Sequence, residues 1–348
     1  MADEENLGTP AGAGHRFGGQ DIDPALTRLV VGLGLLGLLL LIAIARQPLL
    51  DPADLPLPKS ELPSPVMLVT VEDSAGMISY LREQGLWDLD DSGYLSPVIF
   101  ASFPHDIAGL NDTDRKRMFL HALAPTALVA LAEVSQERAE LLKIIDRMDL
   151  ESCTLDQLLD GAVEHNQCGL SRAEVDFLEE LCAKYRTDHL KVLLNRVDVV
   201  PLSLVLAQAA MESSWGASRF ALEGNNVFGI WTWGQHGMVP ANREQGMTHR
   251  VAIYDSLLDS VRSYLLMLNR VGAYRTLREI RRESRDPLEL VNGLKYYSEK
   301  REEYVADLDR LIRVNQLQRY DNFTLALPPQ QVLDQFDSEP VIVTRRDF

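Results

Sequence analysis

A glutamate near the end of an apolar helix is the residue of this 348-residue chain whose type and position best suit catalysis. Pro201 fits the first turn of a helix, where its missing N–H would have no partner anyway. Glu212 falls at the edge of an apolar stripe with helical spacing, formed by Leu202, Val205, Leu206 and Ala209. Partial burial disfavours the charged form of a carboxylate and raises its pKa, which is the property a general acid requires. Gly216 is predicted to end this helix.

An aromatic and amide-rich segment follows Glu212. Trp231 and Trp233 are two residues apart, so both rings would lie on one face of a strand. Exposed aromatic rings beside amides suit sugar rings, which bind by stacking and by hydrogen bonds to hydroxyl and acetamido groups. Core packing of the two tryptophans remains an open alternative. On the first interpretation, Asn226, Phe228, Trp231 and Trp233 are candidate substrate-binding residues.

Residues 207–230, AQAAMESSWGASRFALEGNNVFGI, resemble the signature of the bacterial peptidoglycan glucosaminidases. That signature has the form A-Q-A-x-x-E-S-x-W-G-x-S followed by N-N-x-F-G-I, and the family includes flagellar peptidoglycan hydrolases and autolysin glucosaminidase domains. The pattern is most similar to the Bax branch and extends over about 115–321. The resemblance implies an α+β, mainly α, lysozyme-like domain that cleaves the β-1,4 bond after N-acetylglucosamine. It places the catalytic acid at Glu212.

A second catalytic group is expected, because most glycosidases pair the acid with another carboxylate. In related enzymes this group lies on a hairpin or mobile lobe after the N-N-x-F-G segment, which here corresponds to residues 234–251. Glu244 is the only acidic residue of that stretch and is the candidate by elimination. A solvated hairpin charge is the alternative interpretation of Glu244, and Glu223 is a weaker candidate.

Substrate assistance is a third possibility, in which the acetamido group of the sugar attacks and the protein only orients it. Tyr297 and Tyr304 match family positions for such a role, and Asn226 has suitable chemistry. We therefore keep both tyrosines as candidate binding residues, with structural tyrosines as the alternative.

Two other functions remain open. A lytic transglycosylase or muramidase shares a helix-end glutamate but cleaves on the muramic-acid side of the glycan. A non-catalytic scaffold would bind glycan and organise an envelope assembly. The retention of Glu212 in the signature favours catalysis.

The elements around residues 201–321, the expected catalytic core, are predicted to be mainly helical. Residues 67–200 form a supporting region, with a short strand at Met67–Val71 and helical periodicity from Asp112 onwards. Pro125 is expected to kink or divide this helical region.

Three further helices are expected beyond it. Ser171 and Glu174 have the spacing of a capping box, and another helix is expected at Leu190–Arg196. Tyr254–Leu268 is amphipathic. The basic residues of Arg275–Arg285 are interpreted as a solvated helix face, with contact to stem-peptide carboxylates as a lesser alternative.

The two ends of the chain have different compositions. Residues 1–28 are predicted to be a disordered cytoplasmic tail, and the uncharged run 29–45 a transmembrane helix at the short end of the usual length. Residues 46–66 form a proline-rich linker, and 322–348 a tail that is disordered or packs back on the domain. The expected location is the inner membrane, single-pass, with a periplasmic catalytic domain. Secretion after cleavage following Ala45 is the alternative.

Composition excludes several classes of protein. Hydrophobic residues make up 46% and charged residues 24%, as in globular proteins, and the net charge of −17 disfavours nucleic acid as a partner. The expected partners are glycan strands of peptidoglycan and the inner membrane, and the chain has no P-loop, zincin or paired-cysteine zinc motif. His236 and His249 make a poor metal site, so no metal or cofactor is expected. In an oxidising compartment two of Cys153, Cys168 and Cys182 could pair.

Overall fold

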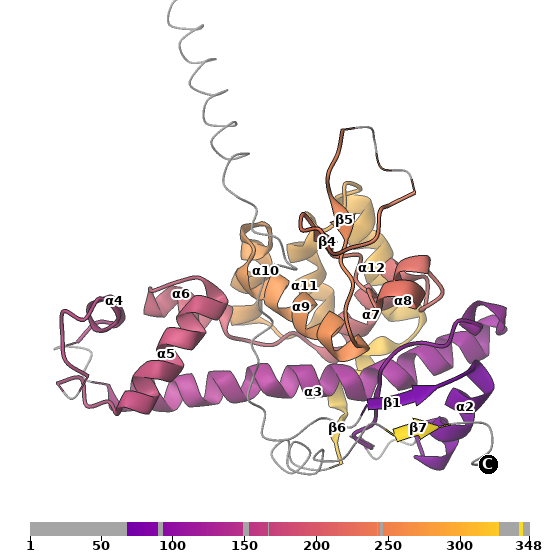
Figure 1. The fold of residues 1–348 in the computed structure, drawn as a ribbon, viewed down its shortest axis with the longest axis horizontal. Helices are drawn as coiled ribbons and strands as arrows, with labels where there is room; N and C mark the ends of the chain where they lie inside the picture. Colours follow the sequence, from indigo (N-terminus) through magenta and orange to yellow (C-terminus); the bar gives the residue numbers. More distant parts are fainter. Residues whose placement is uncertain are drawn as a thin grey trace, which may run out of the picture. The chain divides into compact units, whose positions relative to one another are not determined.

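Helices supply most of the regular structure in the computed structural model, and strands are few and short (Figure 1). The structure describes residues 68–89, 93–148, 153–165, 167–241, 243, 246–326 and 341–343, which lie within the compact unit Leu50–Phe348. The expected tail 1–28, transmembrane helix 29–45 and linker 46–66 lie outside the described residues.

The described helices and strands have the following bounds. The α-helices are α2 (Ser74–Glu83), α3 (Asp112–Arg147), α4 (Leu155–Leu159), α5 (Arg172–Tyr185), α6 (Leu190–Arg196), α7 (Leu202–Ser213), α8 (Arg219–Gly224), α9 (Leu257–Arg270), α10 (Arg275–Glu283), α11 (Pro287–Leu290) and α12 (Glu302–Val314). The 3₁₀ helices are η1 (Ile107–Gly109), η2 (Gly272–Tyr274), η3 (Val291–Leu294) and η4 (Leu317–Asn322). The strands are β1 (Leu68–Val71), β2 (Tyr94–Leu95), β3 (Ile99–Phe100), β4 (Trp231–Thr232), β5 (Arg250–Val251), β6 (Thr324–Leu325) and β7 (Val341–Val343).

The 36-residue helix α3 passes through Pro125 without a break, so the expected division at this proline is wrong. A proline inside a helix costs about 3 kcal/mol. Here residues 118–127 are all buried between α7 and α9, and the Thr126 hydroxyl donates to the Ala122 carbonyl at 3.2 Å. The helix α3 is long and apolar enough to cross a membrane, but 78% of its apolar 18-residue stretch is buried inside the domain. We therefore interpret α3 as a core helix.

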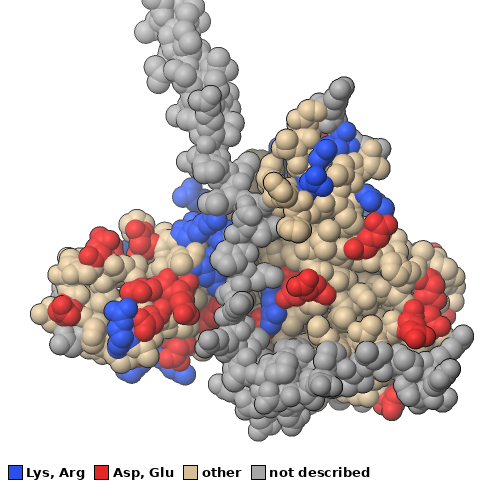
Figure 2. All heavy atoms as spheres, viewed as in Figure 1, with Lys and Arg blue, Asp and Glu red and all other residues tan. Residues whose placement is uncertain are grey.

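The buried hydrophobic side chains of the described residues form two separate clusters along α3. The larger one includes α2, the first part of α3, α7, α9 and α12. The smaller one joins Leu141 and Ile144 of α3 to Leu178 of α5 and Leu193 of α6. The predicted capping box is confirmed at the start of α5, and α6 has the predicted bounds. Figure 2 shows acidic side chains gathered over this smaller lobe, and α5 carries exposed Asp176, Glu179 and Glu180.

A disulfide joins Cys153 to Cys168 in the smaller cluster, with the two Cα atoms 5.4 Å apart. Cys182 is the remaining cysteine and is free and buried. Of the possible pairings that the sequence left open, the structure thus selects this one. The bridge closes a short loop across a lobe that has only a small apolar core.

Removing this disulfide should lower the free energy of unfolding by about 3 kcal/mol, because a cross-link over a loop of this length restricts the unfolded chain by that amount. Denaturant titration of Cys153→Ala/Cys168→Ala against the wild type measures the change. Cys182→Ala is the matched control. A reducing agent should lower the free energy of unfolding of Cys182→Ala but not that of the double variant. Unfolding of the wild type that is indifferent to reducing agent would contradict the pairing.

A small parallel sheet has the strand order β3-β1-β7. Its central strand β1 confirms the strand expected at Met67–Val71, and β7 shows that part of the C-terminal segment packs back on the domain. The helix α2 was not predicted from the sequence. It begins after Asp73, whose side chain accepts from the Gly76 amide, and it buries Met77 and Leu81 one turn apart.

The helix that carries Glu212 is fixed at its first turn by a distant residue. Leu202 is the first residue of α7 and Pro201 occupies the N-cap, so the proline lies one position earlier than expected. The Asp321 carboxylate accepts from the Ser203 amide and from the Ser203 hydroxyl, each at 2.7 Å. A carboxylate at this end satisfies an unpaired N–H and favours the helix dipole.

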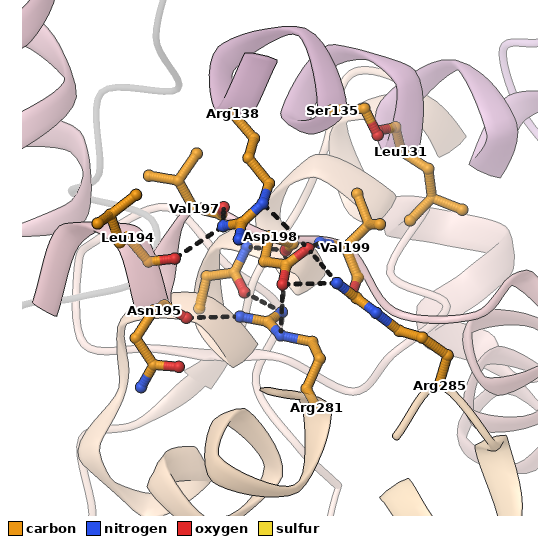
Figure 3. A network of polar contacts seen from close by, with 11 residues as sticks. Leu131, Ser135, Arg138, Leu194, Asn195, Val197, Asp198, Val199, Arg281 and Arg285 are labelled. Carbon is orange, nitrogen blue, oxygen red and sulfur yellow. Dashed lines mark hydrogen bonds and ion pairs between the residues drawn. The ribbon is translucent and has the colours of Figure 1, made fainter. Parts of the chain in front are cut away.

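The interpretation of Arg275–Arg285 as a solvated face is wrong for two of its arginines. Arg278 and Arg281 are only 4% and 2% exposed. Arg278 donates to the Leu268 and Val271 carbonyls. Arg281 donates to backbone carbonyls of the segment before α7 and faces Asp198 (Figure 3). These side chains attach α10 to the rest of the domain.

Candidate active site

Glu212 lies in the last turn of α7 and is partly buried. Burial raises the pKa of its carboxyl to about 6, and a hydrogen bond with Tyr304 acts in the opposite direction. Desolvation disfavours the carboxylate, whereas a donor to the carboxylate favours it. The balance leaves a glutamate that holds a proton up to mildly acidic pH, as expected from its position at the margin of the apolar stripe.

The chain turns sharply directly after Glu212. Ser214, Trp215 and Gly216 have φ values of 52°, 58° and 80°, in the left-handed region. A Cβ atom at Gly216 would lie 3.1 Å from both Ile107 Cδ1 and Phe119 Cδ2, so a larger residue would crowd these side chains. Glycine is the residue that adopts such a conformation without strain. This turn ends α7 close to where the sequence indicated.

The N-N-x-F-G-I segment passes beside the Glu212 carboxylate. A Cβ atom added to Gly229 would lie 3.5 Å from Glu212 Oε2. Asn226 holds this turn: its Nδ2 donates to the Ile230 and Ala252 carbonyls, each at 2.9 Å, and its Oδ1 accepts from the Ile230 amide at 3.0 Å. Asn226 is 1% exposed, and these bonds occupy its amide group. It therefore orients the loop in place of the substrate contact expected for it.

Phe228 also has a packing role where a substrate contact was expected. It is 1% exposed, and its ring stacks on Tyr264 with centroids 4.0 Å apart. Its carbonyl accepts from the Tyr297 hydroxyl at 2.8 Å. Phe228 thus connects the turn beside Glu212 to the tyrosines behind it.

Four tyrosines surround Glu212, and its charge contributes to raising the pKa of each phenol. Tyr297 and Tyr304 were predicted as candidate substrate-binding residues; in the structure Tyr304 is buried, and the two rings stack with centroids 5.5 Å apart. Tyr264 and Tyr274 were missed. The ring centroids of Tyr274 and Tyr297 are 5.9 Å apart. Tyr264 occupies an apolar position of the amphipathic helix α9, so the helical periodicity predicts only a core residue there.

Trp231 and Trp233 are exposed on the short β4–β5 ribbon, with 47% and 43% of their surfaces accessible. The alternative that both are core residues is therefore wrong. The His249 ring stacks on Trp231 with centroids 4.3 Å apart. Among the described residues, no three His, Cys, Asp or Glu side chains are grouped so that they could hold a metal ion.

Of the two candidates for a second carboxylate, the structure describes only one. Glu244 lies outside the described residues. Glu223 is on α8, exposed, and forms an ion pair with Arg219 at 3.5 Å one helical turn away. Glu223 therefore has the environment of a surface charge.

The segment that contains this site is similar to known proteins. Residues 187–317 match the model of the Glucosaminidase family, described as mannosyl-glycoprotein endo-beta-N-acetylglucosaminidase. The chain is 26% identical over 218 residues to Protein bax of Escherichia coli (strain K12), an alignment that covers 59% of this chain and 71% of that protein. A solved structure, the catalytic domain of the autolysin Auto from Listeria monocytogenes, is similar with 21% identity and a TM-score of 0.27, over 40% of this chain and 79% of that domain. The family match and the relative confirm the resemblance drawn from residues 207–230, and the matched segment contains Glu212 and all four tyrosines.

Proposed function

We propose that the glucosaminidase-family domain of this chain, residues 187–317, hydrolyses peptidoglycan by cleaving the β-1,4 bond after N-acetylglucosamine, with Glu212 as general acid. The observation that carries the proposal is the Glu212 environment. Its carboxyl lies at the end of α7, is desolvated, has a pKa of about 6 and forms a hydrogen bond with Tyr304. A carboxylic acid tuned in this way can protonate a glycosidic oxygen near neutral pH.

In this mechanism the Glu212 proton moves to the glycosidic oxygen as the bond to the sugar carbon breaks. The carboxylate that forms then accepts from the Tyr304 hydroxyl. The group on the opposite face of the sugar is proposed to be Glu244, acting on water or on the sugar carbon. The acetamido group of the substrate, oriented by the tyrosines, is the alternative.

Digestion of purified sacculi by the full chain tests the proposal. Mass spectrometry of the released fragments should find N-acetylglucosamine at the new reducing ends. Anhydromuramic ends would identify a lytic transglycosylase, and reducing muramic acid a muramidase. Binding to sacculi with no new ends would identify a scaffold. Each of these three outcomes would overturn the proposed bond specificity.

Hydrolysis is expected to decline as the pH rises through about 6. The protonated form of Glu212 is the active acid, and burial raises its pKa from 4.5 to about 6, so this form is present below that pH and lost above it. A glutamate with an ordinary pKa would be only about 3% protonated at pH 6. The pH dependence of kcat/KM, which reports the free enzyme, measures this midpoint. A rate that does not change across pH 6 would contradict the assignment.

Trp231 is proposed to stack on a sugar ring of the glycan, because its ring is exposed and supported by His249. Trp231→Ala should raise KM by about 5- to 10-fold, corresponding to about 1 to 1.4 kcal/mol for one aromatic contact. Trp231→Phe is the matched control and should retain most of the affinity, because it keeps an aromatic face. Steady-state kinetics on soluble glycan fragments measures both variants. Equal KM values for Trp231→Ala and the wild type would exclude this contact.

A membrane-anchored location with the domain in the periplasm is proposed on two observations. The run 29–45 contains no charged residue, and the Cys153–Cys168 disulfide fits an oxidising compartment. Protease added to spheroplasts should degrade the domain while an N-terminal fragment stays with the membrane. Full protection of the domain, or its recovery in the culture medium, would contradict this location.

A further inference from the structure

A buried glutamine lies one helical turn before Glu212, and its side chain is hydrogen-bonded at both ends. Gln208 and Glu212 are four residues apart on α7, so they project from the same face of the helix. Gln208 is 0% exposed, and a buried amide costs free energy unless its polar atoms have partners. Its Nε2 donates to Tyr304 Oη at 2.9 Å, and its Oε1 accepts from Tyr264 Oη at 2.5 Å.

The chemistry of these groups fixes the direction of each hydrogen bond. An amide nitrogen only donates and an amide oxygen only accepts, whereas a phenol has one proton and can do both. Because Tyr304 accepts from Gln208, its own proton is left for another acceptor. We infer that this acceptor is the Glu212 carboxylate, because Tyr304 lowers the pKa of that carboxyl as a hydrogen-bond donor would. The two hydrogen bonds therefore run one way, from Tyr264 through Gln208 to Tyr304, and the remaining Tyr304 proton is available to Glu212.

The position of Tyr264 is fixed by packing, and its hydroxyl sets the orientation of the Gln208 amide. It is 0% exposed and its ring stacks on Phe228. Its phenol donates to Gln208 Oε1 and so keeps the amide oxygen turned away from Tyr304. Without that donor the amide can rotate by half a turn and present its oxygen to Tyr304. The Tyr304 hydroxyl would then donate its hydrogen bond to Gln208 and no longer to Glu212.

We propose that Gln208 and Tyr264 are positioning residues for the catalytic acid: Tyr264 holds the Gln208 amide in one orientation, and the amide directs the Tyr304 proton towards Glu212. The inference rests on the proposed function of Glu212 as general acid. When Glu212 transfers its proton to the glycosidic oxygen, the new carboxylate meets a donor that is already in place. A preorganised donor stabilises developing charge without reorganisation during the reaction.

The groups around Glu212 allow its titration to be followed separately. Among the described residues, the titratable side chains that interact with it are Tyr264 of α9, Tyr274 of η2, Tyr304 of α12 and Tyr297, which follows η3. Burial, helped by the Glu212 charge, raises the pKa of each of these phenols, so all four stay neutral near pH 6. A midpoint in that range therefore does not come from these phenols, and carbon-13 NMR of the Glu212 carboxyl assigns it directly.

Tyr264→Phe tests the proposal, because it removes one hydroxyl and keeps the ring stacked on Phe228. The expected result is a kcat about 10-fold lower, a part of the 10²–10⁴-fold that a general acid contributes, with KM nearly unchanged. The alkaline midpoint of the pH–rate profile should move upwards, because the carboxylate loses a donor. Gln208→Met fills the same space but no longer directs the Tyr304 proton, so the midpoint should move in the same direction by less, because no amide oxygen competes for that proton.

Tyr320→Phe is the matched control, since Tyr320 is also fully buried and its hydroxyl is hydrogen-bonded to His121 Nε2 at 3.0 Å. It should keep the wild-type pH profile. Carbon-13 NMR titration of the Glu212 carboxyl in the full chain, without substrate, provides a readout that does not depend on activity. A higher Glu212 midpoint in Tyr264→Phe than in Tyr320→Phe supports the proposal, and equal midpoints overturn it. Absence of glycan cleavage by the wild type would refute the proposed function, while this titration would still decide the positioning role.

Discussion

Replacing Glu212 with glutamine should reduce the rate of glycan cleavage by about 10²–10⁴-fold, the usual contribution of a general acid. Glutamine has nearly the same size and can keep a contact with Tyr304, but it has no acidic proton to give to the leaving oxygen. KM should change little, because the sugar-binding surface is intact. Release of soluble fragments from purified sacculi by the full-length variant measures the effect.

Glu223→Gln is the matched control for this substitution. Glu223 is exposed and paired with Arg219 on the surface of α8. Exposed ion pairs contribute little energy, so this variant should stay within about twofold of the wild-type rate. A Glu212→Gln protein that lyses sacculi as fast as Glu223→Gln would show that another residue provides the proton.

Replacing Asp198 with asparagine should destabilise the domain by about 3–5 kcal/mol, because it removes one partner of a buried ion pair. The Asp198 carboxylate is only 8% exposed and faces Arg281, whose side chain is 1% exposed, at 3.7 Å (Figure 3). Burial lowers the pKa of Arg281 to about 10, and Asp198 acts against that shift. Without Asp198 this guanidinium would keep its desolvation cost and lose the compensating charge. Chemical denaturation of the full chain measures the loss.

The other partners of Asp198 explain why this network matters for α7. Arg285 donates to both carboxylate oxygens at 2.8 and 3.0 Å, and Arg138 of α3 lies 3.9 Å away. Asp198 precedes the start of α7 by only a few residues, so the network connects α3 and α10 to the helix that carries Glu212.

Asp309→Asn is the control for this second prediction. Asp309 pairs with Arg313 on the surface of α12 at 2.9 Å, and loss of such a pair costs about 0.5 kcal/mol or less. If Asp198→Asn and Asp309→Asn had equal unfolding free energies, the buried network would contribute nothing to stability.

Local sequence patterns predicted the elements that depend on local interactions. The bounds of α6 and the capping box of α5 followed from helical periodicity and capping chemistry. The partial burial of Glu212 followed from its position at the edge of the apolar stripe of α7. The left-handed turn at Gly216 followed from the residue type. In each case the interacting residues lie within a few positions of one another in the chain.

Features that depend on distant contacts could not be predicted in the same way. Arg281 has the spacing of a surface residue, and only the approach of Asp198 makes its burial possible. Pro125 predicts a kink or a division of the helix, but packing against α7 and α9 keeps α3 continuous. Tyr264 has the spacing of a core residue, and its hydrogen bond to Gln208 forms only because the folded domain brings α9 close to Gln208 of α7. These are contacts between segments that no single stretch of sequence contains.

A crystal structure of the full-length Glu212→Gln variant with a bound N-acetylglucosamine oligosaccharide would test the central claim most directly. We predict that the residue 212 side chain lies about 2.6–3.2 Å from a glycosidic oxygen, the distance needed for proton transfer. The sugar chain should also lie against Trp231, and the same structure would show whether Glu244 faces the opposite side of that bond. An oligosaccharide bound with every glycosidic oxygen out of reach of residue 212 would contradict its role as the catalytic acid.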